Sequence, residues 1–280
     1  MQDLISTIKN TINKDNNLPF SVYSSVHEQK LLNVPIAKPL LIVVLKGHKE
    51  LGINNETICP SESFVFLSDN SAINMRNIPK DNAYFALLIE FDYEDFGGIP
   101  YSSNHSNKTL NSDYFIGEVT STLKNCLQQF VESTRWAPET LWTLRKKELL
   151  MLLYYLGYQN LVSMMGKPKV SHHVHELCQE SEFDKLTNEY ICQQLAMSES
   201  TLRRKLKLEG TNIQAIKDRA KLGLGLHLLQ TTMSPIGIIA DKCGYHSQSR
   251  FTDRFKSHFG LTPSELRKTK MTDKGDNLTV

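Results

Sequence analysis

The sequence predicts an α+β protein of two domains, with an antiparallel β-barrel in its N-terminal part and an all-α C-terminal part. Short apolar runs separated by turn residues recur between Leu18 and about Tyr93, whereas apolar residues recur at helical spacing from about residue 182 onward. Charge divides in the same way: residues 182–270 carry 15 Lys and Arg against 9 Asp and Glu, a net of +6, and residues 1–181 have a net charge of −3. A chain of 280 residues is long enough for two such cores.

Composition narrows the class of protein. A hydrophobic content of 40% excludes a mainly disordered chain. The N-terminal stretch "DLISTIKNTI" is polar and helix-like rather than typical of a signal peptide, and the longest apolar run, "LLMLLYYLGY", is too short to span a bilayer. The cysteines are odd in number, scattered and without a CxxC pair, which is typical of reduced thiols: Cys59, Cys126, Cys178, Cys192 and Cys243. We therefore expect a soluble, cytoplasmic chain without a membrane partner.

The predicted strands of the N-terminal part lie in the segments "PLLIVVLKG", "ESFVFLS" and "NAYFALLIEFD". Several short strands with turns between them favour an antiparallel sandwich or barrel. A small-molecule effector could enter such a barrel among aromatic and aliphatic side chains, for which the candidates are Phe64, Phe66, Tyr84 and Leu87. The alternatives are that the barrel binds another protein or serves only for dimerisation.

Two helices are expected at about 113–160, which would complete a domain spanning residues 1–165. Apolar residues from Ile116 to Phe130 recur at helical spacing, and a second helical pattern follows Pro138. The second helix becomes apolar nearly all round, so Leu149, Leu150 and Leu153 need burial either against the barrel or in a dimer contact. Residues 166–181 are expected to be an interdomain linker that leads into a helix.

The stretch "LAMSESTLRRKLKLEG" predicts a short helix with one dry and one cationic side. Ser198 is a suitable N-cap and Gly210 a natural stop. Leu202 and Leu206 share one face, and Ser200, Arg204 and Lys207 lie nearly opposite, with Arg203 at the flank. A shorter helix with Thr187 as its candidate cap precedes it across the turn "AMS". This is the helix-turn-helix pattern, although a solvated basic face without a partner would look similar.

A second copy of the pattern strengthens the prediction. In "SPIGIIADKCGYHSQSRFTDRFKSHFGLTPSE", Ser234-Pro235 is the expected helix start, "CGY" the turn and Ser247 the cap of a further helix. The segment "TNIQAIKDRAKLGLGLHLLQTT" is expected to join the two units as one helix. Gly223 and Gly225 inside it cost about 1 kcal/mol each relative to alanine, which would allow either angular adjustment or, as we favour, close packing.

These motifs resemble those of the AraC/XylS family of bacterial transcription regulators over about residues 182–268. The matching stretches are "LAMSESTLRRKLK", "RAKLGLGLHLL" and "IIADKCGYHSQSRFTDRFKSHFGLTPSELR". The resemblance implies a double helix-turn-helix DNA-binding domain over residues 182–270, followed by a tail at 271–280. Its two recognition helices would enter successive major grooves about 34 Å apart. The N-terminal segment is similar to the family's cupin-like sensor domains, and the helices after it are similar to the family's dimerisation helices.

The resemblance also implies which side chains contact promoter DNA. The implied base contacts are Ser200, Arg203, Arg204, Gln248, Ser249 and Arg250, and the implied phosphate contacts are Thr201, Lys207, Thr252 and Lys256. Asp253 stands where the first unit has Arg204, so it would repel phosphate unless it accepts from cytosine N4 or pairs with Arg250. We therefore predict that the second unit reads DNA more weakly. RNA polymerase and a second copy of the chain are further implied partners; activation is expected, and repression is an alternative.

Other chemistries find little support in the sequence. His172, His173 and His175 do not share one helical face, and His27 and His48 do not complete the HxH…E…H ligand set of metal-dependent cupin enzymes. Nucleophile signatures and a phosphate-binding glycine loop are absent as well. We expect a regulator without a metal or cofactor. The remaining alternatives are a regulator controlled only by protein–protein contact and a cupin-type enzyme with an accessory nucleic-acid-binding domain.

Overall fold

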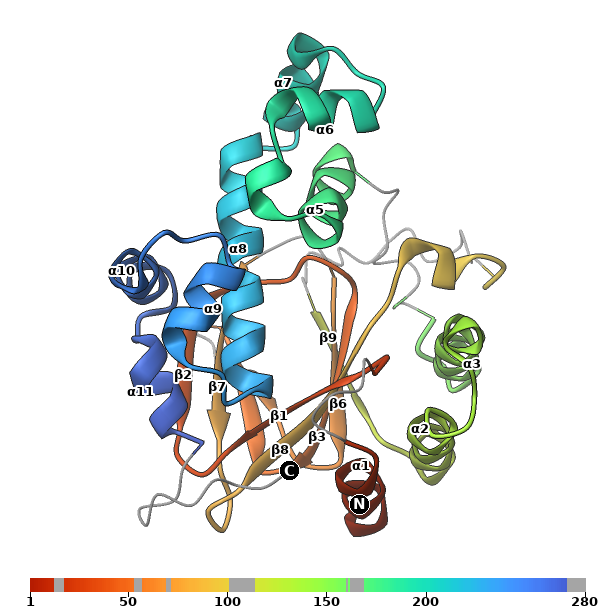
Figure 1. Ribbon diagram of the computed structural model, residues 1–280. Coiled ribbons are helices and arrows are strands. Elements are labelled where there is room, and N and C mark those ends of the chain that lie inside the picture. Colours follow the sequence, from red (N-terminus) through yellow and green to blue (C-terminus); the bar gives the residue numbers. More distant parts are fainter. Residues whose placement is uncertain are drawn as a thin grey trace.

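A computed structural model of the chain describes residues 1–12, 18–52, 57–68, 72–100, 114–159, 161 and 169–270 (Figure 1). It consists of an N-terminal β domain with three covering helices and a C-terminal helical domain. The two-domain α+β architecture predicted from the sequence is confirmed. Among the described residues, none of the helices has the length and apolar character needed to cross a membrane.

The β domain contains two antiparallel sheets. Five strands form one sheet in the order β1 (Ser21–Ser25), β8 (Tyr84–Glu90), β3 (Leu40–Lys46), β6 (Ser63–Leu67) and β9 (Tyr114–Glu118). The other sheet has the order β2 (Gln29–Pro35), β7 (Ala72–Ile78), β4 (His48–Leu51) and β5 (Thr57–Cys59). No ladder joins the two sheets among the described strands, so the expectation of a closed barrel is wrong and the domain is an open pair of sheets.

The central strands β8, β3 and β6 of the five-stranded sheet are buried on both faces, which explains their nearly continuous apolar sequences. Its outer face packs on the helices α1 (Gln2–Thr11), α2 (Ser121–Ser133) and α3 (Trp142–Tyr155), which lie along one side of the domain in Figure 1. Within β3, Leu41 and Val43 belong to this outer cluster, whereas Ile42 and Val44 belong to the cluster on the inner face. Successive side chains of a strand therefore serve two separate cores.

The segment before α2 differs from its prediction. Residues 114–118 form β9 and pair with β6, with Phe115 opposite Phe66 and Ile116 opposite Val65. The apolar residues at Phe115 and Ile116 fit a helical period, but their aromatic and β-branched side chains also favour an edge strand, and sheet pairing decides the outcome. The helix begins only at Ser121, where the Thr120 side chain accepts from the Leu123 amide. The second helical segment opens with a 3-10 turn, η3 (Glu139–Leu141).

The C-terminal domain is built from short helices around one long helix. Its elements are α5 (Val170–Glu180), η4 (Phe183–Lys185), α6 (Asn188–Gln194), α7 (Glu199–Leu208), α8 (Ile213–Thr231), α9 (Ile236–Lys242), α10 (Gln248–Phe259) and α11 (Pro263–Lys268). Three expected N-caps are confirmed: the side chains of Thr187, Ser198 and Ser247 each accept from a backbone amide of the following turn. The fourth differs, because Pro235 rather than Ser234 precedes α9 and no side chain caps it.

Two segments named from the sequence fall partly or wholly outside the described residues. The expected tail at 271–280 lies outside them, as does the start of the expected linker, residues 166–168. From Val170 onward the expected linker is the helix α5. Most of this segment is therefore a packed helix that belongs to the C-terminal domain.

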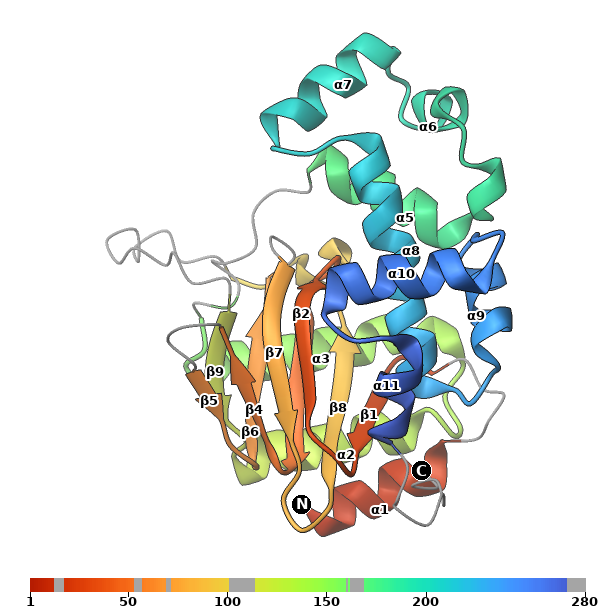
Figure 2. The same ribbon diagram turned by 90° about the vertical axis from the view of Figure 1, so that its left-hand side faces the viewer.

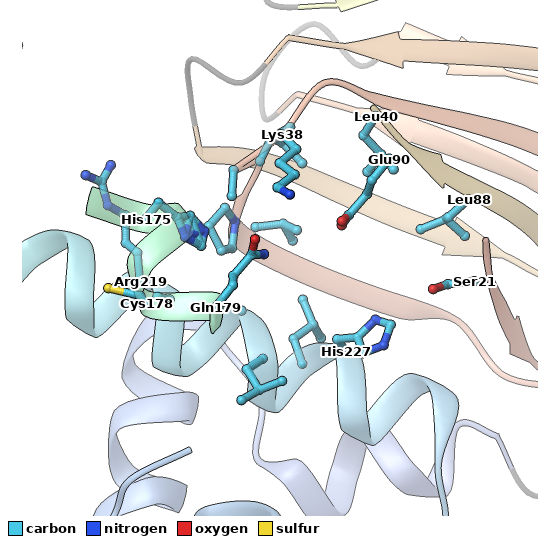
Figure 3. A pocket seen from close by; sticks show the side chains of 18 of the residues that line it. Ser21, Lys38, Leu40, Leu88, Glu90, His175, Cys178, Gln179, Arg219 and His227 are labelled. Carbon is cyan, nitrogen blue, oxygen red and sulfur yellow. The ribbon is translucent and has the colours of Figure 1, made fainter. Parts of the chain in front are cut away.

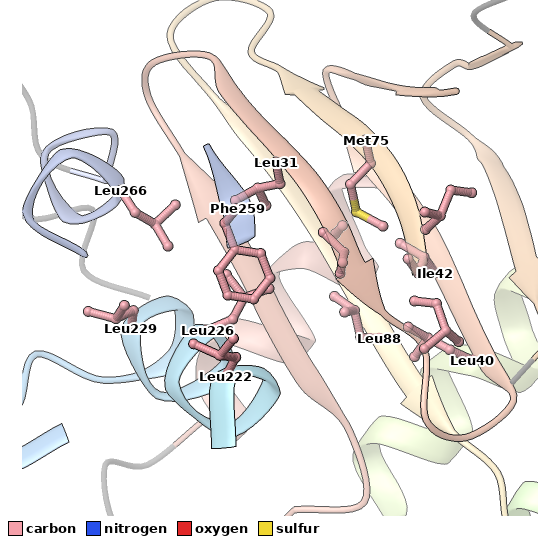
Figure 4. Close-up of a cluster of buried hydrophobic side chains, with 14 of the residues drawn as sticks. Leu31, Leu40, Ile42, Met75, Leu88, Leu222, Leu226, Leu229, Phe259 and Leu266 are labelled. Carbon is pink, nitrogen blue, oxygen red and sulfur yellow. The ribbon is translucent and has the colours of Figure 1, made fainter. Parts of the chain in front are cut away.

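The two domains share one hydrophobic core. Leu222, Leu226 and Leu229 of α8, together with Phe255 and Phe259 of α10, belong to the same cluster as the inner faces of both sheets, as Figure 4 shows. Figure 2 shows α10 and α11 beside β2, whereas α6 and α7 lie at the far end of α8. The helix pair α9–α10 is thus docked on the β domain, whereas the pair α6–α7 projects away from it.

Candidate nucleic-acid interface

The helix pairs α6–α7 and α9–α10 have matching turns. In each turn one residue adopts the left-handed conformation, Ala196 with φ 49° and Gly244 with φ 68°. A serine then caps the second helix of each pair, Ser198 or Ser247. Counted from these caps, Ser200 corresponds to Ser249. The second turn is one residue longer, and its glycine adopts the left-handed conformation without the strain that Ala196 carries.

Helix α7 has the two-sided character that its sequence predicts. Leu202 and Leu206 are fully buried, and Ser200, Arg203, Arg204 and Lys207 are exposed. Thr201 is half-buried, and its hydroxyl accepts from the Ser198 hydroxyl at 2.9 Å. The exposed face is therefore free of apolar contacts and rich in donors.

The cations of this face differ in their partners. Arg203 donates to the Glu199 carboxylate at 2.6 Å, one helical turn earlier. Arg204 and Lys207 make no ion pair within the described part of the chain. Glu199 thus fixes the guanidinium of Arg203, while Arg204 and Lys207 stay open to an outside anion.

Helix α10 presents a mixed face. Phe251, Phe255 and Phe259 are buried on its inner side. The other predicted contact residues are exposed, apart from half-buried Thr252: Gln248, Ser249, Arg250, Asp253 and Lys256. Asp253 and Arg250 form no ion pair in the described structure. The free carboxylate of Asp253 therefore adds negative charge to a surface that would face phosphate.

Helix α8 connects the two pairs without interruption. A Cβ atom added at Gly225 would lie 2.7 Å from Cε2 of Phe251 and 3.4 Å from Sγ of Cys243. At Gly223 the only neighbour within 4 Å would be Cγ of Pro35, at 3.4 Å. Gly225 therefore lets α10 approach α8 closely, which supports the packing interpretation of these glycines.

A large cavity lies between the β domain and the helical domain. It has a volume of about 860 Å³ and is lined by residues of β1, β8, α5 and α8 among others. In Figure 3, Lys38 and Glu90 point toward it from the β domain, and Gln179 and His227 lie on the helical side. Lys38 is held by Asp92 at 2.7 Å, whereas the Glu90 carboxylate has no hydrogen-bond partner in the described structure. The inner end of the cavity reaches Lys49, Met75 and Tyr84 between the two sheets.

Burial tunes the ionisable groups of this cavity. Desolvation lowers the pKa of His227, against the opposing effect of the Glu90 charge. The hydroxyl of Tyr23 lies 3.5 Å from Nδ1 of His227, and burial raises the pKa of this tyrosine well above its ordinary value. Burial also lowers the pKa of Lys49 to about 8. The cavity wall therefore combines apolar side chains with many polar and charged ones, which come from both domains.

Of the four predicted pocket residues, only Tyr84 lines this cavity. Phe64, Phe66 and Leu87 are fully buried on the opposite face of the five-stranded sheet, against the helices. A strand that is buried on both faces gives no sequence signal for which side chains point inward. Sequence reasoning also missed Lys38, Lys49, Glu90 and His227, because their shared cavity joins segments far apart in the chain.

The residues predicted for a dimer helix lie in the interior of the β domain. Leu149, Leu150 and Leu153 are buried in the outer core of the β domain, so packing within the chain, one of the two expected outcomes, accounts for them. The exposed apolar side chains of this region are others: Trp136, Leu141, Leu144 and Tyr155.

The three linker histidines take separate positions. His172 Nδ1 accepts from the Lys169 amide at 2.9 Å and lies 3.0 Å from the Tyr93 hydroxyl, which ties α5 to the β domain. His173 is exposed, and His175 is half-buried at the cavity. Within the described residues, no three His, Cys, Asp or Glu side chains gather closely enough to hold a metal ion.

Comparisons with known proteins agree with this architecture. The helix-turn-helix domain family matches residues 191–269. The HTH-type transcriptional regulator GadX of Escherichia coli O6:H1 is 35% identical over 77 residues, which are 28% of this chain and 28% of GadX. The urease operon transcriptional activator of Escherichia coli is 27% identical over 177 residues, 61% of this chain and 58% of the activator. The chain thus matches less than two thirds of the length of either relative.

Solved structures extend the likeness to the whole fold. A single-residue variant of apo ToxT from Vibrio cholerae has a TM-score of 0.64 at 16% identity, with 91% of this chain and 99% of ToxT covered. Wild-type ToxT with a bound unsaturated fatty acid has a TM-score of 0.60 at 14% identity, covering 91% and 97%. Residues 191–269 match a helix-turn-helix domain family, in agreement with the AraC-type resemblance, and GadX and the urease operon activator are transcriptional regulators by name.

Proposed function

We propose that this chain is a sequence-specific regulator of transcription that inserts α7 and α10 into successive major grooves of promoter DNA. One observation carries the proposal: two exposed helix faces with basic and polar side chains follow matching turns and matching serine caps. A helix of this kind fits the major groove, where arginine binds guanine in bidentate fashion and lysine meets phosphate. The net charge of +6 over residues 182–270 supplies attraction to a polyanion.

The roles of single residues follow from their chemistry and position. Arg204, exposed and unpaired, is the strongest candidate for a base contact, and Arg203 joins it in the orientation set by Glu199. Lys207 lies one turn further along α7 and suits a phosphate. On α10, Gln248, Ser249 and Arg250 would read bases, but the free carboxylate of Asp253 would weaken the approach to DNA. We propose that α7 contributes more of the specificity than α10.

Activation, contact with RNA polymerase and dimer formation belong to the same proposal. One relative, which matches 61% of the chain, is named for activation of the urease operon. The two antiparallel sheets support assignment of the β domain to the cupin-like sensor domains. We propose in addition that this domain binds no metal and has no enzymatic role. The site of action would be the bacterial cytoplasm, where the promoter is.

We further propose that a small molecule in the interdomain cavity controls DNA binding. The volume of about 860 Å³ suits a ligand of drug-like size, and the cavity touches both domains. ToxT, which shares this fold, has been solved with an unsaturated fatty acid bound. A molecule with an apolar body and an acceptor group would match the mixed apolar and polar lining of the cavity.

Two substitutions on α7 test the DNA-binding proposal. Arg204→Ala should weaken binding to the preferred site by about 1–3 kcal/mol and relax base preference there, because a bidentate contact is lost. Lys207→Ala should weaken binding to all DNA to a similar extent and flatten its salt dependence, because a phosphate contact is lost. Fluorescence anisotropy with matched and mismatched duplexes measures both. Equal effects of the two variants on every sequence would refute the assignment of the outer face.

Oleate, as an unsaturated fatty acid, tests the effector proposal on the full-length protein. A ligand that binds only the folded state must raise the unfolding midpoint with increasing concentration. Leu224→Trp, which places a larger side chain in the cavity wall, should abolish the shift, whereas Leu208→Trp at an exposed position should retain it. A shift that persists in the Leu224→Trp protein would place the binding elsewhere.

A further inference from the structure

Lys49 is a buried cation at the inner end of the interdomain cavity. It is 2% exposed and contacts no carboxylate of the described residues. Its ammonium group donates to Oδ1 of Asn77 and contacts Sδ of Met75 at 3.4 Å. An ammonium group has three donors and loses much hydration free energy on burial, so neutral partners alone satisfy it poorly. Lys49 is therefore well placed to exchange its partner for an acceptor of a ligand.

A chain of buried hydrogen bonds begins at Lys49 and crosses to the helical domain. Asn77 Nδ2 donates to Gln29 Oε1 at 2.9 Å, and Gln230 Nε2 of α8 donates to the same oxygen at 3.0 Å. Gln29 Nε2 in turn donates to Oγ1 of Thr269, at the end of α11, at 2.8 Å. Gln29, Asn77 and Gln230 are each 1% exposed, so no bulk water can replace a lost partner in this chain.

The far end of this chain is the place where the second helix pair docks. The carbonyl oxygen of Thr269 accepts from the amides of Val26 and His27, at 2.8 and 3.1 Å. Its hydroxyl donates to the Leu266 carbonyl oxygen at 2.6 Å, which closes α11. Beside it, the buried ammonium group of Lys270 donates to the Leu229 and Gln230 carbonyl oxygens. The position of Thr269 therefore decides how α11, and α10 with it, sits on the β domain.

We infer that Lys49, Asn77, Gln29 and Gln230 form a relay that couples occupancy of the cavity to the docking of α9–α11. The inference rests on the proposed function, because it specifies how the proposed effector site acts on the DNA-binding domain. Tyr84 provides a second donor at the cavity end: its hydroxyl is buried and has no hydrogen-bond partner among the described residues, and its ring lies 5.6 Å from the Lys49 ammonium. The ligand group that fits there is a hydrogen-bond acceptor, and an anionic one fits best.

Binding of such a group changes the relay in a defined way. When Lys49 turns to the ligand, Oδ1 of Asn77 loses its donor, and a buried unpaired acceptor is costly. The amides of Asn77 and Gln29 then rearrange to recover partners, at the expense of the bonds to Gln230 and Thr269. The docking of α11 weakens, and α10 gains freedom to adjust to α7 on DNA. The ligand thus favours the undocked arrangement because it binds that arrangement more tightly.

Hydrogen exchange of the full-length protein without ligand tests the relay. The amides of Val26 and His27 report directly on the bond to Thr269. Gln29→Met removes the centre of the relay and should speed their exchange at least tenfold. Lys49→Met removes its cavity end and should speed exchange at least threefold. Lys38→Met changes another cavity lysine, one held by Asp92 outside the relay, and should leave exchange within twofold of wild type.

The outcomes separate the relay from the proposed function. If Lys49→Met leaves the exchange of Val26 and His27 unchanged while Gln29→Met accelerates it, the relay does not reach the cavity and the inference is wrong. Asn77→Leu replaces Gln29→Met as the interruption if the latter does not fold, as judged by its unfolding midpoint. Sequence-specific DNA binding by wild type, measured in parallel, tests the proposed function independently, since the exchange result does not depend on DNA.

Discussion

At the scale of single residues, His175 shows how the boundary between the domains depends on pH. It lies in α5, where burial and then the nearby positive charges of Lys38 and Arg219 lower its pKa to about 4. An ordinary histidine has a pKa of about 6.5, so the unfolded chain binds a proton at this position more readily than the native protein. The native state therefore holds His175 neutral and loses stability as the pH falls below about 6.5, down to about 4.

Acid unfolding should reveal this residue. At pH 5, His175 should lower the free energy of unfolding by about 1–2 kcal/mol relative to pH 7.5. His175→Gln should reduce the difference between the two pH values by that amount in urea titrations. His173→Gln removes an exposed histidine from the same helix and serves as the control variant. An unchanged pH dependence in His175→Gln would show that the native pKa is not depressed.

At the scale of elements, the two glycines of α8 make a matched pair. Gly225→Ala puts a methyl group 2.7 Å from the Phe251 ring, so we expect a loss of about 1–3 kcal/mol of stability through overpacking. Gly223→Ala meets only Pro35 at an ordinary contact distance and should be neutral or stabilising by up to about 1 kcal/mol, because alanine favours the helix. Urea unfolding of both variants measures the difference. Equal stability changes would mean that α8 and α10 are not held in close contact.

Much of the helical domain could be predicted from the sequence, because its signals are local. Thr187, Ser198 and Ser247 cap the helices where expected, and Leu202 and Leu206 are buried as the helical period requires. The β domain was less predictable, since strand pairing depends on distant segments. Residues 114–118 were expected to begin a helix and form β9 instead, and the two sheets do not close into a barrel.

The two candidate sites, the exposed face of α7 and the interdomain cavity, also differ in how far the sequence predicts them. The exposed face of α7 follows from spacing within one helix, so its residues could be named in advance. Residues of β1, β8, α5 and α8 line the cavity together, and no local sequence pattern predicts that Lys49 or Glu90 lies in its wall. Phe64 and Phe66 have the composition of pocket residues but face the helices, because a doubly buried strand hides its orientation.

At the scale of the whole molecule, the two helix pairs stand in different situations. The pair α9–α10 shares a core with the β domain, whereas α6–α7 contacts the rest through α5 and α8. Glu209, just after α7, accepts from the amides of Val170 and Ser171 at 2.9 Å and so ties the first pair to α5. Control of DNA binding through the β domain is therefore expected to act mainly on the position of α10.

If the helical domain recognises a particular DNA sequence, the purified full-length protein should select specific fragments from genomic DNA. Affinities for the selected fragment and for a scrambled control are compared at about 150 mM salt, where phosphate contacts alone give weak binding. We expect the selected fragment to bind at least about 10³-fold more tightly than the control. A ratio near one, both for the full-length protein and for residues 170–280 alone, would contradict it and leave only a basic surface with general affinity for polyanions.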